Sequence, residues 1–233
     1  MPRPLCLTAA HLAQIPPYLG PPQPFELAGE VSTDEDLGHL LDALLAKGPK
    51  EVWIFAYGSL IWNPEFPPAE DRIAHLHGWH RKFCLGPITI FRGCPDRPGL
   101  MLALDRGGSC RGVAYKVQPN RVRQDLIALL RREMPLRPAA YAPRWSKVQT
   151  DDGPVTALLF PIDRRAAAYA RGACEDQVIT SLSTAAGDRG TMAEYLLNTV
   201  SHLQKRGIHD RYLWRLQSRV AQKIMANAQT PTL

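Results

Sequence analysis

The chain of 233 residues lacks any long uninterrupted apolar run, although 45% of its residues are hydrophobic. A membrane-spanning helix needs about 18 consecutive apolar residues, and no stretch of the sequence approaches that length. The amino-terminal stretch also lacks the apolar segment of a secretory signal, because Thr8, His11 and Gln14 interrupt it. We therefore expect a protein that neither spans a membrane nor enters the secretory pathway.

Cysteine is scarce and poorly arranged for cross-linking or metal binding. The cysteines number five, and no two of them are separated by only two residues, which argues against a disulfide framework and a zinc knuckle. Reduced thiols in the cytoplasm are the simpler interpretation. The sequence therefore predicts a cytoplasmic protein without a metal or another cofactor.

Acidic residues are too few to balance the basic ones. The chain has 28 Lys and Arg against 22 Asp and Glu, a net charge of +6, which favours encounters with acidic small molecules. The basic residues are scattered, and no basic run is interleaved with aromatic residues that would stack on bases. We therefore expect no nucleic-acid partner.

The sequence also lacks an internal repeat, a domain linker and a regular β-α-β alternation. Residues 1–30 are proline-rich and predict an irregular N-terminal arm, followed by a single domain over residues 31–233. Short apolar segments punctuated by Gly and Pro predict strands, and apolar residues at helical spacing predict helices. The expected strands are 52–57, 81–86, 88–93, 100–105, 110–117 and 153–162, and the expected helices are 34–47, 118–134, 174–186, 191–206 and one after Asp210. Strands followed by helices indicate an α+β fold with a small curled sheet.

Glu133 is the first candidate for acid–base chemistry. It lies three and four residues beyond Leu130 and Leu129, so it shares their apolar helix face. Burial raises the pKa of a carboxyl group, and the negative end of the helix dipole raises it further, which suits a general acid or base near neutral pH. The structural alternative is an ion pair with Arg132 or Arg137 at a frayed helix end.

The turn Tyr57-Gly58-Ser59 is the second candidate, because it ends an apolar strand. Backbone N–H groups of Gly58, Ser59 and Leu60 can converge on an anion, as they do in turn nests. Gly58 has no Cβ and permits close approach, while Ser59 adds a hydroxyl group. A plain turn is the alternative interpretation.

Three other candidates favour structural roles. His75 and His77 have the spacing of zinc ligands on one side of a strand, but no third ligand is evident. Cys110 lacks a neighbouring histidine or helix N-terminus that would activate its thiol, so we expect a buried structural cysteine. Glu194 has a sufficient role in a capping box that begins at Thr191.

Several motifs together resemble the ChaC-like γ-glutamylcyclotransferases. They occur in the order and rough spacing of that family, from about Trp53 to Val220, and leave the N-terminal arm outside. The motifs are WIFAYGSLIWNPEF at 53–66, GWHRKFCL at 78–85, FRGCPDRPGLMLALDRGGSCRGVAYKV at 91–117, REM at 132–134, EYL at 194–196 and GIHD at 207–210. The combination of YGSLIW with a downstream RGxxxxPGL is specific.

The resemblance implies a compact mixed β-barrel with flanking helices. It also implies an enzyme that cyclises the γ-glutamyl group of glutathione to 5-oxoproline and releases Cys-Gly. The catalytic glutamate of the family matches Glu133, and its substrate-binding positions match Phe55, Ala56, Tyr57, Gly58, Ser59, Leu60 and Tyr141. The chain departs from the family at Ala140, near which many members have glycine, and at Met192, where many have asparagine.

The implied chemistry needs no metal and no enzyme thiol, because the nucleophile is the α-amine of the substrate. The α-carboxylate would rest on the turn while Glu133 moves a proton. Two alternatives remain open from the sequence. One is a cyclotransferase for other γ-glutamyl amines or peptides, and the other is a non-enzymatic regulator of cation transport on the same fold.

Overall fold

The structure is a computed structural model that describes residues 4–24, 26 and 28–229. The chain divides into two compact units, which are described separately. The helical unit comprises Met1–Ala28, Phe83–Met101 and Ala170–Leu233, and the barrel unit comprises Gly29–Lys82 and Leu102–Tyr169. The described residues of the N-terminal arm up to Ala28 thus belong to the helical unit, and the single domain over 31–233 stays a prediction.

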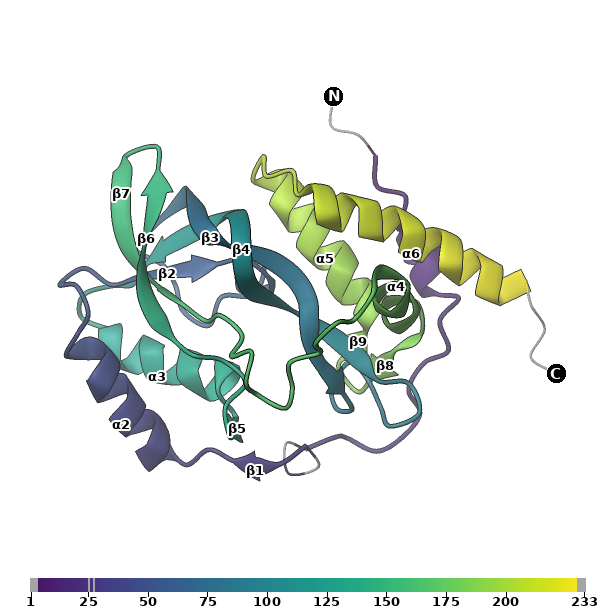
Figure 1. The fold of residues 1–233 in the computed structure, drawn as a ribbon, viewed down its shortest axis with the longest axis horizontal. Coiled ribbons are helices and arrows are strands. Elements are labelled where there is room, and N and C mark those ends of the chain that lie inside the picture. The colour runs from purple at the N-terminus through teal and green to yellow at the C-terminus, as the bar shows by residue number, and fades with distance from the viewer. Residues whose placement is uncertain (1–3, 25, 27, 230–233) are drawn as a thin grey trace. The chain divides into compact units, whose positions relative to one another are not determined.

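A closed barrel of five strands forms the centre of the barrel unit (Figure 1). The strands follow the order β2-β4-β3-β6-β7, and β2 pairs antiparallel with β4 and parallel with β7. Their bounds are β2 Trp53–Ala56, β3 Glu70–Ile88, β4 Gly99–Lys116, β6 Arg144–Thr150 and β7 Gly153–Leu159. The long strands β3 and β4 continue into the segments assigned to the helical unit. The predicted α+β fold with a mixed barrel is confirmed.

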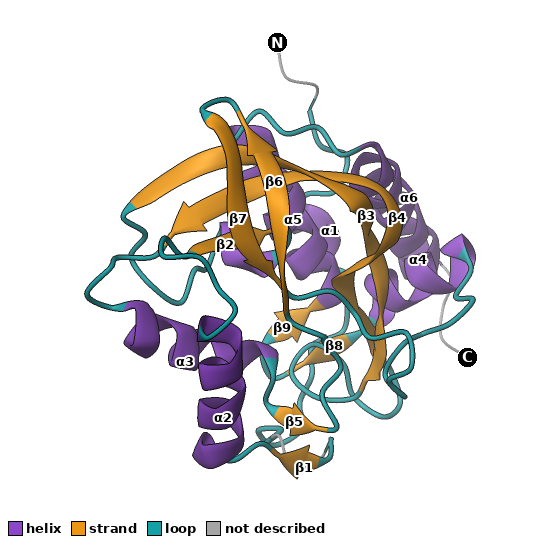
Figure 2. Cartoon of the chain, turned by 60° about the vertical axis from the view of Figure 1, so that its left-hand side comes forward, coloured by secondary structure: helices purple, strands orange, loops and turns teal. Residues whose placement is uncertain are grey.

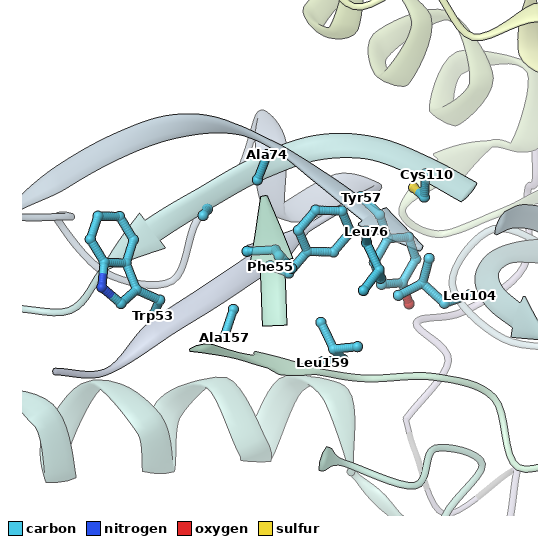
Figure 3. Packing of buried hydrophobic residues seen from close by; sticks show 11 residues of the cluster. Trp53, Phe55, Tyr57, Ala74, Leu76, Leu104, Cys110, Ala157 and Leu159 are labelled. Atoms are coloured by element: carbon cyan, nitrogen blue, oxygen red, sulfur yellow. The ribbon is translucent and has the colours of Figure 1, made fainter. Parts of the chain in front are cut away.

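Strand β2 is buried along its whole length because it lies between two neighbours. Side chains alternate along a strand, so Trp53, Phe55 and Tyr57 project together into the barrel interior (Figure 3). They pack there against Leu76 of β3, Leu104 of β4 and other buried residues. The strand that leads to the Tyr57-Gly58-Ser59 turn is therefore anchored in the core.

Two helices of the barrel unit, α2 (Asp34–Leu45) and α3 (Val122–Glu133), pack against each other (Figure 2). Helix α2 begins with a capping box in which Asp36 accepts from the Thr33 N–H and the Thr33 hydroxyl accepts from the Asp36 N–H. Helix α3 buries Leu126, Leu129 and Leu130 of its apolar face and ends at Glu133. The short strands β1 (Glu30–Val31) and β5 (Leu136–Arg137) pair antiparallel.

The helical unit is built on three packed helices, α4, α5 and α6. Their bounds are Glu175–Thr184, Met192–Lys205 and Arg211–Gln229, and the smaller elements are α1 (Ala9–Leu12), β8 (Ala186–Gly187) and β9 (Gly190–Thr191). The buried Gln217 of α6 accepts hydrogen bonds from the N–H groups of Cys6 and Leu7. The described N-terminal residues are therefore held on α6, and no described helix has the length and apolar character needed to cross a membrane.

Several local expectations were wrong. The expected strands 100–105 and 110–117 form the single strand β4, the expected strand 81–86 is part of the longer β3, and the arm expected to be irregular contains α1. The segment 88–93 continues β3 only to Ile88 and then turns, with the Arg92 N–H donating to the Ile90 carbonyl. Strand β6 was not expected at all. At the start of α5, the Thr191 hydroxyl caps the Glu194 N–H, but the Glu194 carboxylate pairs with Arg92 at 2.9 Å, so the capping box is incomplete.

Candidate active site

The site begins where β2 ends and the chain enters a short 3-10 helix, η2 (Ser59–Ile61). The Ile61 N–H donates to the Gly58 carbonyl, and the N–H groups of Trp62 and Asn63 donate to the Ser59 carbonyl. The N–H groups of Gly58, Ser59 and Leu60 precede these donors and take no part in the hydrogen bonds of the turn. Three consecutive donors of this kind are available to an anion, which makes the turn a candidate backbone nest.

Tyr57 fixes the base of this turn from inside the barrel. Its hydroxyl group donates to the Phe160 carbonyl at 3.2 Å, and its own carbonyl accepts from Arg81 at 2.6 Å. Phe55 and Ala56 have no exposed surface, and Tyr57 and Leu60 are also buried. The side chains of these residues set the position of the turn, whereas its backbone and Ser59 form the candidate anion site.

Glu133 is the last residue of α3, and its side chain is 13% exposed. Burial raises the pKa of its carboxyl group from the ordinary 4.5 to about 7, Arg132 lowers it, and the carboxylate of Glu65 adds to the rise. A carboxyl group with this pKa exchanges a proton near neutral pH, which is the property required of a general acid or base.

Arg132 joins Glu133 to the turn. Its Nε lies 3.2 Å from Oε1 of Glu133, and its Nη2 donates to the Ser59 hydroxyl at 2.7 Å. Its Nη1 donates to the Asn63 carbonyl and to Glu65, both at 2.6 Å. One guanidinium group thus fixes the carboxyl group and the first residue of η2 in a common arrangement. The ion pair offered as the structural alternative for Glu133 therefore exists, and it belongs to the site.

The sequence provided little signal for this role of Arg132. Arg131 and Arg132 are adjacent and look equivalent in the sequence, but they point to different partners. Arg131 is exposed and pairs with Asp34 of α2, whereas Arg132 reaches the turn. The two arginines differ only in the side of α3 from which they project. Which side faces the turn depends on the folded position of the turn, and that is not visible in the sequence.

Other predicted residues lie on different elements. Tyr141, in the segment that joins β5 to β6, forms an isolated bridge with Ile162, which follows β7. The neighbouring Ala140 carbonyl accepts from the Asp163 N–H at 2.8 Å. Met192 is fully buried in the helical unit, where its Sδ lies 3.2 Å from the place of a Cβ at Gly99. Both departures from the family pattern are therefore accommodated by local packing.

The weaker candidates have structural surroundings. The rings of His75 and His77 on β3 are tilted by 45° with centroids 4.2 Å apart, and Cys110 is buried in the barrel core. Burial, His77 and Arg111 lower the pKa of His75. Among the described residues, no group of three or more His, Cys, Asp or Glu side chains is placed to hold a metal ion.

Comparison with solved structures identifies the class of fold. A crystal structure of a yeast γ-glutamyl cyclotransferase specific to glutathione matches with a TM-score of 0.66 at 19% identity, covering 74% of this chain and 96% of that one. The barrel with its flanking helices is therefore the γ-glutamylcyclotransferase fold.

Sequence comparison then identifies the family. The profile described as ChaC-like protein matches residues 52–223, so the chain belongs to the ChaC-like family. The glutathione-specific γ-glutamylcyclotransferase of Escherichia coli K12 is 40% identical over 73% of this chain and 74% of its own length. The mouse glutathione-specific γ-glutamylcyclotransferase 1 is 33% identical over 67% of this chain and 71% of its own length.

Proposed function

We propose that this protein is a glutathione-specific γ-glutamylcyclotransferase, which converts glutathione to 5-oxoproline and Cys-Gly. The names of the similar proteins from E. coli and mouse support this substrate. The observation that carries the proposal is that Arg132 contacts both Glu133 and Ser59 of the turn, and so joins them in one site. Carboxyl groups with pKa values raised to about 7 cluster at catalytic sites, so this group favours an enzyme over a non-enzymatic regulator.

The turn would hold the glutamyl end of the substrate. The N–H groups of Gly58, Ser59 and Leu60 face the α-carboxylate, and the Ser59 hydroxyl adds a polar contact. With the carboxylate held, the α-amine folds back on the γ-carbonyl of the same residue. Positioning of two groups in one molecule contributes roughly 7–11 kcal/mol to such reactions in favourable cases.

Glu133 would move the proton. Its carboxylate accepts a proton from the α-ammonium, and the freed amine attacks the γ-carbonyl carbon to form the new C–N bond of the ring. The tetrahedral intermediate collapses as the bond to the cysteine nitrogen breaks and Glu133 gives its proton to that nitrogen. The regenerated carboxylate then takes the second proton, which the ring nitrogen must lose, and releases it to the departing amine or to water. N–H groups of the turn that remain free stabilise the oxyanion.

The remaining predicted substrate residues would act from behind the turn or beside it. Phe55, Ala56, Tyr57 and Leu60 are buried, so their contribution is to fix the backbone that presents the donors. Tyr141 is half-buried and stays a proposed contact for the substrate. We also propose a cytoplasmic enzyme that acts on a small molecule and not on nucleic acid, which the five free cysteines and the scattered basic residues support.

Comparison of glutathione with γ-glutamyl-alanine tests the substrate assignment. We expect the purified protein to form 5-oxoproline from glutathione, detected by chromatography, with a much higher kcat/KM than from γ-glutamyl-alanine. Equal rates would favour the broader γ-glutamyl cyclotransferase alternative. An absence of 5-oxoproline from both compounds would contradict the proposal.

Replacement of Arg132 tests the connection between the turn and Glu133. Because Arg132 lowers the pKa of Glu133, Arg132→Met should move the acidic limb of the kcat/KM profile toward higher pH. The loss of the Ser59 contact should also misplace the turn, and together we expect kcat/KM at pH 7 to fall ~10–100-fold. Steady-state kinetics from about pH 5.5 to about pH 9, which brackets the pKa of Glu133, measure both effects.

The matched control for this variant is Arg131→Met on the same helix. Arg131 pairs with Asp34 at an exposed position, so its loss should leave both stability and the pH profile almost unchanged. An unchanged profile in Arg132→Met would show that the guanidinium group does not act on Glu133.

The proposed reaction is expected to need neither a metal nor an enzyme thiol, because the substrate supplies the nucleophile. Activity after exhaustive dialysis against a chelator should stay within a few-fold of the untreated enzyme. Cys110→Ala should likewise retain its turnover and lose about 1–2 kcal/mol of stability, since the side chain packs in the barrel core. Loss of activity on chelation would revive the metal interpretation of His75 and His77.

A further inference from the structure

Arg81 is a basic residue inside the barrel unit to which the proposed mechanism has so far given no role. It lies on β3 and is 3% exposed. Its Nε donates to the Tyr57 carbonyl at 2.6 Å, and its Nη2 donates to the Arg111 carbonyl of β4. A guanidinium group is rarely buried to this extent, and here it spans the two strands that flank the candidate anion site.

The contacts of Arg81 lie where the β2–β4 ladder stops. The last paired residues are Ala56 and Val113. Tyr57 is the first residue after β2, and Arg111 lies two residues before Val113 in β4. Gly112 permits a close approach of the two strands here, because a Cβ on it would lie 2.4 Å from the Ala56 carbonyl oxygen. Arg81 therefore replaces backbone pairing at the point where the chain leaves the sheet to form the turn.

A change of side-chain alternation along β3 directs Arg81 inward. Ala74 and Leu76, at even positions, face the barrel core, whereas beyond Gly78 the inward residues are Trp79 and Arg81, at odd positions. Gly78 has a φ of +81°, a conformation that glycine adopts without a Cβ penalty. Local irregularities of this kind re-aim side chains in many barrels, and this one aims a cation at the Tyr57 carbonyl.

The Tyr57 carbonyl and the Gly58 N–H belong to one planar peptide unit. In a trans peptide the two groups point in opposite directions, so a clamp on the carbonyl also fixes the direction of the N–H. The charge of Arg81 further polarises the peptide unit, which strengthens the N–H as a donor.

We propose that Arg81 is a positioning residue that clamps the Tyr57–Gly58 peptide and aims the Gly58 N–H at the α-carboxylate of the γ-glutamyl substrate. The inference rests on the proposed function for the identity of the anion. The Arg81 side chain itself stays behind the peptide and does not touch the substrate. Its effect is therefore selective for substrates that carry the α-carboxylate.

The test compares glutathione with 4-aminobutyryl-Cys-Gly, which has the same amine and γ-carbonyl but no α-carboxylate. Arg81→Met removes both the charge and the donors, and Arg81→Lys keeps the charge but loses the planar fork. We expect kcat/KM for glutathione to fall ~10²-fold in Arg81→Met, with a smaller loss in Arg81→Lys. The preference for glutathione over the analogue should fall at least ~10-fold, because the aimed donor is lost.

Lys82→Met is the matched control, since Lys82 is the next residue of β3 and is only half-buried. It should keep the wild-type preference. In the pH profile of kcat/KM, the Arg81 variants should keep the midpoint of the acidic limb, which reports the pKa of Glu133. Arg132→Met should shift this midpoint. A folded Arg81→Lys or Arg81→Met with an unchanged preference for glutathione would overturn the proposal. A loss of stability without a change of preference would also overturn it, because Arg81 would then have a structural role only.

A second measurement is independent of turnover. In protein labelled with 15N-glycine, the Gly58 amide signal should shift between wild type and Arg81→Lys, whereas that of Gly38 on α2 should not. If wild type forms no 5-oxoproline but the Gly58 signal moves, the action of Arg81 on the Tyr57–Gly58 peptide is supported and the proposed substrate is refuted. If wild type is active and neither the signal nor the preference changes, the clamp alone is refuted.

Discussion

Glu133→Gln should lower kcat for 5-oxoproline formation by ~10²–10⁴-fold, the range associated with loss of a general acid or base. The amide keeps the size of the side chain and removes its ability to accept the ammonium proton. Because the pKa of Glu133 is about 7, wild-type kcat/KM should rise roughly tenfold per pH unit below pH 7 and level off above it. The residual activity of the variant should lack this limb.

Stability provides the control for this variant. The folded protein holds the Glu133 proton up to a pKa of about 7, whereas the unfolded chain releases it near 4.5. Stability therefore falls between these two values as pH rises, by about 3 kcal/mol for this group. Glu133→Gln cannot ionise, so its free energy of unfolding should exceed that of wild type above pH 7.

Glu51→Gln provides a matched substitution at an exposed ion pair of the barrel unit and should leave both kinetics and stability almost unchanged. Thermal melts at pH 5 and pH 8, together with chromatographic assays, separate the expectations. Near-normal turnover by a folded Glu133→Gln would remove Glu133 from the mechanism.

The parts of this site that could be predicted depend on local patterns. Helix α3 has its apolar residues at helical spacing, so the burial of Glu133 beside Leu129 and Leu130 followed from the sequence. The end of β2, which the structure places at Ala56, also followed to within one residue, because a continuous apolar run stops at Gly58. Both features arise within a few residues of the chain.

The parts that could not be predicted depend on contacts between distant segments. Arg132 meets Ser59 across 73 positions, and Arg81 meets Tyr57 across 24. The change of alternation at Gly78 is not visible as a pattern, because a glycine inside a strand has several possible causes. Strand β6 was missed since only Val148 in it is fully buried, which leaves no apolar alternation to detect.

The second large expected effect concerns the turn. Gly58→Val should reduce kcat/KM for glutathione by ~10²–10³-fold, the cost of losing an aligned backbone donor, because a branched Cβ would stand where the anion lies. The fold should be largely retained, since β2 is anchored through Trp53, Phe55 and Tyr57 and not through the turn. Gly38→Val on α2 adds the same side chain where nothing lies within 4 Å and should leave activity unchanged.

Substrate selectivity distinguishes an anion site from a plain turn. If the N–H groups of Gly58, Ser59 and Leu60 hold the α-carboxylate, wild type should prefer glutathione over 4-aminobutyryl-Cys-Gly by ~10⁴-fold, because the analogue leaves desolvated donors unpaired. Gly58→Val should lose most of that preference, since its cradle no longer accepts the carboxylate. Chromatography follows the two cyclic products, 5-oxoproline and 2-pyrrolidinone, in parallel reactions. Equal turnover of both compounds by wild type would mean that the turn only ends a strand, and the carboxylate would then have to be held elsewhere.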